Sequence, residues 1–368
     1  MKKRYQHFIT RLIKYEKNHP LMPFVWAAAV ILLIMGAIYG INRLMTVQDL
    51  KTQMEVEFES EALKKEVQIL LGKQDIYQAD LNGISNLKIE NNKDLDDIQD
   101  LAKFANLVQL TIINCNIMDI SVLAEMPSLK IMNIQQNNIY SIEGIEKAVN
   151  LTEINLSYNQ ISDMSPLYRM QQVTNVVLNN NNLSMISDEI QNMKNLQSLS
   201  LDSNRLISIN SICNLESLSY LSAAGNKLTV QPILNGLPHL EVLSLANNML
   251  MDIDSVGELP SLKNLNVGKN YLSSLTFVNK YPKLEKLDIS YNQYETLEGV
   301  LECPTLQSIN IIGTSIQDVR VLAELPVFNA IYVNDIFDRE QLDFMVGSFY
   351  NADPITKQYL LDKQYNLE

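Results

Sequence analysis

The sequence predicts an α/β solenoid, in which short turns of the chain stack so that their strands form one parallel sheet. We expect a helical cap at each end of the stack and one N-terminal transmembrane helix. The first observation is an apolar frame, L-x-x-L-x-L-x-x-N-x-L, which recurs eleven times at steps of 22 or 23 residues. The second is a change of apolar rhythm inside each repeat, and the third is an uncharged N-terminal stretch of 21 residues.

Residues 21–41 form this uncharged stretch and predict the transmembrane helix. At about 1.5 Å per residue it would span roughly 30 Å, the thickness of a bilayer core. Six basic residues and one acid precede it, so the positive-inside rule predicts a single-pass cell-membrane protein with a cytoplasmic N-terminus and an extracytoplasmic repeat domain. A cleaved signal peptide is the alternative, but the leader is long and no A-x-A site follows. Gly36 and Gly40 form a G-x-x-x-G motif, a candidate contact for a homodimer.

Each repeat reads as one strand followed by a return path. In residues 151–170, Ile154 and Leu156 alternate with polar residues, which is typical of a strand with one buried face. From Ile161 on, every third residue is apolar, which favours a 3₁₀ or extended return path. Because a single turn cannot bury its apolar row alone, neighbouring turns must stack. The frames begin at Ile84, Leu107, Leu129, Leu151, Val173, Leu196, Leu218, Leu240, Leu262, Leu284 and Leu306.

The ninth position of the frame is an asparagine in most repeats. Its amide can pair with backbone groups that would otherwise be buried without partners, so we predict a structural role for this column. Cys115 and Thr314 occupy the same position near the two ends. The asparagines are Asn92, Asn137, Asn159, Asn181, Asn204, Asn226, Asn248, Asn270 and Asn292.

This repeat resembles the leucine-rich repeat family, and within it the 22-residue bacterial class of internalin-like proteins. The resemblance covers Ile84 to about Val333. It implies a horseshoe whose concave face is the parallel sheet and binds other proteins. It also implies a bacterial source and a short N-terminal helix before the repeats.

The chain divides into six segments on these grounds. Helical spacing of Leu63 and Val67 predicts the first cap, and Asp338 is the N-cap candidate for a helix in the second. The segments are a basic cytoplasmic tail (1–20), a transmembrane anchor (21–41), a juxtamembrane stalk (42–60), an N-terminal cap (61–83), about twelve repeats (84–336), and a C-terminal cap and tail (337–368).

The candidate binding site lies on the strand positions that face away from the core. These positions are rich in amides and hydroxyls and poor in charges and aromatic residues. Since tyrosine is common at interface hot spots, we predict a partner-binding patch where amides lie near two tyrosines. Its residues are Asn133, Gln135, Asn155, Ser157, Tyr158, Asn179 and Tyr220.

Catalysis, cofactors and metals are not expected. His239 is the one histidine outside the N-terminal tail, so no Ser/His/Asp or Cys/His set is available. The three cysteines form no metal-ligand motif, and a net charge of -13 argues against nucleic acid. We therefore predict a non-enzymatic, membrane-anchored protein that binds a protein partner close to the outer face of the cell membrane. The alternatives are an internalin-like surface adhesin for host interaction and, if the topology is reversed, a cytoplasm-facing scaffold.

Overall fold

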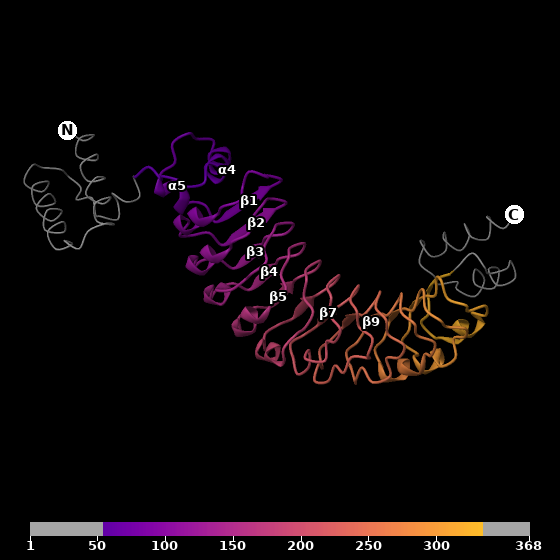
Figure 1. The fold of residues 1–368 in the computed structure, drawn as a ribbon. Coiled ribbons are helices and arrows are strands. Elements are labelled where there is room, and N and C mark those ends of the chain that lie inside the picture. Colours follow the sequence, from indigo (N-terminus) through magenta and orange to yellow (C-terminus); the bar gives the residue numbers. More distant parts are fainter. Residues whose placement is uncertain (1–53, 334–368) are drawn as a thin grey trace, which may run out of the picture.

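The computed structural model describes residues 54–333 as one curved stack of turns (Figure 1). Each turn adds one strand to a 12-stranded sheet, in which the strands follow each other in chain order and all pair in parallel. This confirms the predicted parallel-sheet solenoid. The strands are β1 Asn86–Glu90, β2 Gln109–Ile113, β3 Ile131–Asn133, β4 Glu153–Asn155, β5 Asn175–Val177, β6 Ser198–Ser200, β7 Tyr220–Ser222, β8 Val242–Ser244, β9 Asn264–Asn266, β10 Lys286–Asp288, β11 Ser308–Asn310 and β12 Ala330–Tyr332.

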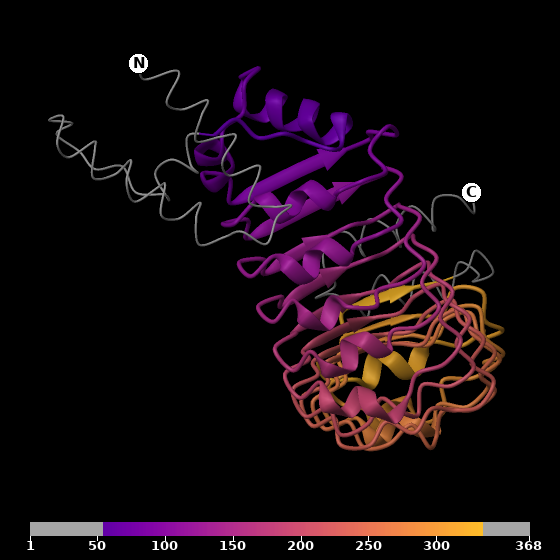
Figure 2. The same ribbon diagram turned by 60° about the vertical axis from the view of Figure 1, so that its left-hand side comes forward.

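The return paths lie on the convex side of the stack. Short 3₁₀ helices of neighbouring turns lie side by side there (Figure 2). Between η5 and η6, the turns that follow β6, β7 and β8 return without such a helix, so both predicted forms of return path occur. The 3₁₀ helices are η1 Gln99–Lys103, η2 Ser121–Glu125, η3 Ile145–Lys147, η4 Ser165–Arg169, η5 Asp188–Asn192, η6 Thr276–Lys280, η7 Val300–Glu302 and η8 Arg320–Glu324.

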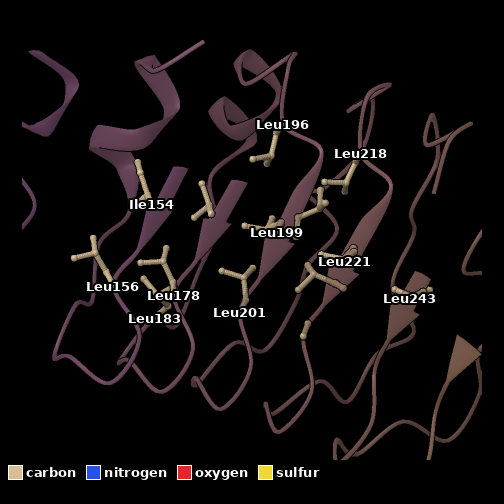
Figure 3. Packing of buried hydrophobic residues seen from close by; sticks show 14 of the residues in the cluster. Ile154, Leu156, Leu178, Leu183, Leu196, Leu199, Leu201, Leu218, Leu221 and Leu243 are labelled. Carbon is tan, nitrogen blue, oxygen red and sulfur yellow. The ribbon is translucent and has the colours of Figure 1, made fainter. Parts of the chain in front are cut away.

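The core is a single apolar column between the sheet and the return paths. The strand register places equivalent positions of successive repeats against each other, as in Leu199 with Leu221 and Leu221 with Leu243. These leucines are 0% exposed and point into the interior (Figure 3). Because the period is nearly constant, each apolar row is buried by the same row of the next turn.

The backbone takes a left-handed conformation where it leaves each strand. At the eighth position of the frame, φ lies between 52° and 60° in every described repeat without a glycine there. Asparagine tolerates this region better than other side chains, whereas a left-handed residue with a larger side chain costs about 1–2 kcal/mol. Tyr158 and Tyr291 occupy this position, with φ values of 57° and 52°.

The N-terminal end of the sheet is covered by α4 (Glu61–Leu71) and α5 (Gln78–Asn82). Ser60 caps α4 by accepting a hydrogen bond from the Leu63 N–H, and Gly72 ends the helix in the left-handed conformation. Leu63 and Val67 are the buried residues of α4 and join the core of the repeats. The helix therefore lies where the sequence places a cap.

The prediction of a transmembrane helix as part of this fold is wrong for the described chain. No helix within residues 54–333 is long and apolar enough to cross a membrane. The reason is the repeat itself, since polar residues interrupt the apolar ones in every turn and the 11-residue α4 is the longest helix of this region. Residues 21–41, Gly36 and Gly40, and the predicted C-terminal cap lie outside the described residues.

Candidate functional site

The asparagine column forms a buried ladder along the stack. In Asn159, the side-chain amide donates to the carbonyl oxygens of Ile134 (2.8 Å) and Leu156 (3.0 Å), while Oδ1 accepts from the Ile139 N–H (3.1 Å). Ile134 and Ile139 belong to the preceding turn, so each ladder asparagine joins two turns. The same pattern of bonds recurs at Asn181, Asn204, Asn226, Asn248, Asn270 and Asn292.

The two ends of the ladder differ from its middle. Asn92 is half-buried and donates to Glu66 of α4 at 2.7 Å, so it connects the cap to the repeats. Cys115 is buried, and its burial raises the pKa of the thiol above its usual value. Thr314 donates to the Ile311 carbonyl oxygen at 2.7 Å. These positions complete the stack and offer no reactive group.

A second ladder of polar side chains shapes the convex turns. Asp119, Asp163 and Asp252 each accept a hydrogen bond at 2.8 Å from the N–H two residues further on. Serine takes the same role at Ser141 and Ser274. These acids therefore form turns, and no group of three histidine, cysteine or acidic residues between positions 54 and 333 could hold a metal ion.

The concave face contains a hollow of about 720 Å³ in its C-terminal half. Tyr220 of β7 and Tyr332 of β12 lie at its two ends and are 37% and 38% exposed. The sheet between them contributes mostly amide, hydroxyl and carboxylate groups. Its polar lining residues include Asp202, Asn264, Asn266, Asp288 and Asn310.

Hydrogen bonds hold the side chains of this hollow in fixed orientations. Asp202 Oδ1 accepts from the hydroxyl of Ser222 (2.5 Å) and from the N–H of Ala224 (2.8 Å). One oxygen of Asp288 accepts from the Ser290 N–H, and the other accepts from the amide of Asn310 at 3.1 Å. A surface ordered before binding loses less entropy when a partner docks.

The predicted patch lies mostly outside this hollow. Of its seven residues, only Tyr220 lines the hollow. Ser157 is buried and donates to Asn155 of its own turn at 2.8 Å. Asn179 accepts from the Ser200 hydroxyl and the Asp202 N–H of the next turn at 2.8 Å, so these groups already have partners within the stack. Tyr158 is 52% exposed at the edge of the concave face. Asn133 and Gln135 remain on the N-terminal half of that face.

Sequence reasoning missed the C-terminal residues of the hollow. Asn264, Asn266 and Asn310 occupy the same frame positions as the predicted residues, so the repeat pattern could have included them. Tyr332 belongs to a twelfth, imperfect copy of the frame that starts at Phe328, after the eleven regular ones, where the pattern is weakest. No local signal marks which half of the sheet forms a hollow.

Comparison with known families agrees with this geometry. A model described as "Leucine rich repeat" matches residues 171–228, and one described as "Leucine Rich repeats (2 copies)" matches residues 127–169 and 216–260. Comparison with curated proteins gives no match. The chain therefore carries leucine-rich repeats.

Solved structures show the same fold. An internalin from Listeria monocytogenes is 23% identical, with a TM-score of 0.63 over 80% of this chain and 94% of that one. The leucine-rich repeat ectodomain of a plant membrane receptor kinase from Arabidopsis thaliana, solved in complex with CASPARIAN STRIP INTEGRITY FACTOR 2, is 19% identical, with a TM-score of 0.53 over 70% of this chain and 36% of that one. At these identities the likeness concerns the fold alone, which is similar to that of an internalin.

Proposed function

We propose that the described domain is a non-enzymatic binding module that takes a protein partner into the concave hollow between Tyr220 and Tyr332. The observation that carries the proposal is the hollow itself, with a preorganised polar lining and an exposed tyrosine at each end. Tyrosine offers a large rigid contact surface and a polar tip, which suits interface hot spots.

The dimensions of the hollow favour a protein chain over a small molecule. It extends from β7 to β12, about 24 Å at a strand spacing near 4.8 Å. Sites for small molecules are enclosed and mostly apolar, whereas this surface is long and open, and polar and apolar groups contribute to it equally. A segment of a partner protein can lie along it and use the amides of Asn264 and Asn266 for hydrogen bonds.

Photocrosslinking from defined positions of the full chain tests this proposal. We would place p-benzoylphenylalanine at Tyr220, Tyr332 or Tyr158 and, as a control, at the exposed Val149 of the return path, and expose each protein to ultraviolet light in its native host. Adducts with one protein from positions 220 and 332, and none from 149, would support binding in the hollow. Adducts from position 158 alone would move the partner to the N-terminal half of the face, and their absence from all three tyrosine positions would refute concave binding.

We further propose an extracytoplasmic location for the repeat domain. The support is the acidic character of the repeats, which disfavours contact with the anionic cytoplasmic face of a membrane. A tag placed after Glu368 can be tested with protease on spheroplasts, with and without detergent. Loss of the tag without detergent is expected, while protection until detergent is added would favour the cytoplasmic scaffold.

A further inference from the structure

A second exposed surface follows the segment just after each ladder asparagine. Six apolar side chains project there from seven successive turns and are between 56% and 74% exposed. Four of them lie three residues after the ladder position, while Met185 and Val230 lie four residues after it. We call them the flank stripe: Met118, Tyr140, Met185, Ile207, Val230 and Met251.

Backbone hydrogen bonds hold the turns of the flank stripe in register. The N–H of Asn138 donates to the Ile117 carbonyl oxygen at 2.9 Å, and the N–H of Lys227 donates to that of Leu206 at 2.9 Å. Equivalent bonds join the other neighbouring turns of this region. Hydrogen-bonded neighbours are about 4.7 Å apart, so the stripe extends about 28 Å from the turn of Met118 to that of Met251. The one gap is the turn that carries Ser162.

The flank stripe has defined ends. In the next turns toward the C-terminus, the third residue after the ladder position is Ser273, Glu295 or Gln317. In the turn before Met118, the exposed residue that follows the buried Leu95 is Asp96. Single exposed apolar residues need no explanation, but a contiguous row with polar borders marks an interaction surface. The row is separate from the concave hollow, because none of its members lines that hollow.

The two long edges of the flank stripe differ in charge. On the convex edge, Asp119 follows Met118, Asp252 follows Met251, and Asp188 lies three residues after Met185. All three carboxylates are exposed, and none forms a salt bridge with another described residue. The other edge is neutral or basic, with Arg205 and Lys227. A partner with basic residues along one side therefore matches the acidic edge.

We propose that the flank stripe binds an amphipathic α-helix of a partner protein, with lysine or arginine along the side that faces the aspartates. A helix returns the same face every 5.4 Å or so, close to the turn spacing of the stripe. An extended strand presents side chains on one face only every 6.6–6.8 Å or so, which fits less well. Flexible methionines at Met118, Met185 and Met251 accommodate the remaining mismatch. A helix of about 20 residues would cover the length.

A designed peptide provides the test, with the full chain as receptor. The probe is a fluorescein-labelled 20-residue helix that carries leucines on one face and lysines along one side of it. One control peptide has the same composition in scrambled order, and another has glutamate in place of the flanking lysines. Fluorescence anisotropy measures the dissociation constant of each peptide.

Variants of the full chain test whether the peptide binds to the flank stripe. We expect Met185→Ser combined with Ile207→Ser to weaken binding of the amphipathic peptide at least tenfold, and Val149→Ser, an equally exposed apolar residue elsewhere, to change it less than twofold. Tyr220→Ala should leave this affinity unchanged, because it alters the hollow alone. Thermal unfolding checks that the variants remain folded.

Three results would overturn the proposal. The first is equal affinity for the scrambled or glutamate-flanked peptide, and the second is equal affinity of the double variant and the unmodified chain. The third is a dimer of the full chain in analytical ultracentrifugation that the double variant dissociates, because the stripe would then cover a second copy of this chain.

Discussion

The carboxylate of Asp100 lies against the backbone of Ser60, 40 residues earlier in the chain. Its Oδ2 atom accepts hydrogen bonds from the N–H groups of Glu59 (2.7 Å) and Ser60 (2.9 Å), and Lys103 forms an ion pair with the same side chain. Ser60 is in turn the N-cap of α4. One buried acid of the first return path thus fixes the helix that covers the end of the sheet.

We expect Asp100→Ala to detach this cap. The substitution leaves the Ser60 N–H without its partner in a buried place, at a cost of about 3 kcal/mol in the free energy of unfolding. Hydrogen exchange should increase across residues 61–71. The control is Asp96→Ala, an exposed acid nearby, which should change stability by less than about 0.5 kcal/mol. Equal effects of the two substitutions would contradict the role given to Asp100.

Replacing a ladder asparagine should destabilise the middle of the stack. Asn181→Leu removes bonds to the Ile161 N–H and to the Leu156 and Leu178 carbonyl oxygens. We expect a loss of about 3 kcal/mol in urea unfolding, because these backbone groups stay buried. Gln160→Leu, the same kind of change at an exposed position, should have little effect. A similar loss at both positions would exclude the ladder as the cause.

Tyr294→Phe should leave the protein as stable as before or stabilise it by about 1 kcal/mol. The hydroxyl of Tyr294 is fully buried without a hydrogen-bond partner, and burial raises the pKa of this side chain above its usual range. The matched control is Tyr168→Phe. Tyr168 is also buried, but its hydroxyl accepts from the Ser187 N–H at 3.2 Å, so that substitution should destabilise. Thermal unfolding of the two variants compares them directly.

Asp318 provides a prediction for acid pH. Hydrogen bonds from the side chain and backbone of Arg320 lower the pKa of Asp318 from its usual 3.8 to about 2. Because the pKa of Asp318 is lower in the folded protein than in the unfolded chain, its carboxylate stabilises the fold at pH values above about 4. This contribution is lost as the pH falls from about 4 to 2. The pair is more than half exposed, so the contribution stays below about 1 kcal/mol. NMR titration should show the pKa of Asp318 rising in Arg320→Gln, and an unchanged pKa would contradict the assignment.

The cysteines should differ in reactivity. Burial raises the pKa of the Cys115 and Cys303 thiols and shields them from reagents, whereas Cys213 is half-buried. We expect a maleimide to label Cys213 first in the folded protein and all three cysteines in denaturant. Mass spectrometry of peptides identifies the labelled sites. Fast labelling of Cys115 would show that the first turns open readily.

The periodic part of the molecule could be predicted from the sequence. The frame places β3 to β11, the buried leucines such as Leu199, and Asn159 with its equivalents, because a parallel stack repeats one set of contacts. The position of the hollow could not be predicted from the sequence, because it depends on how the curvature of the whole sheet arranges distant strands such as β7 and β12. The hydrogen bond from the Ser60 N–H to Asp100 could not be predicted either, since it joins a repeat to a segment outside the repeat pattern.

The asparagine ladder gives the stack a direction. The Ile139 N–H is paired only through Asn159 of the following turn, and the Leu183 N–H only through Asn204 of the next one. During synthesis on the ribosome, some backbone N–H groups of a turn that has just emerged therefore lack hydrogen-bond partners until the next turn has been made. The growing end stays incomplete until the last repeats appear, so deleting turns from the C-terminus would expose buried N–H groups, whereas deleting them from the N-terminus would expose asparagine side chains.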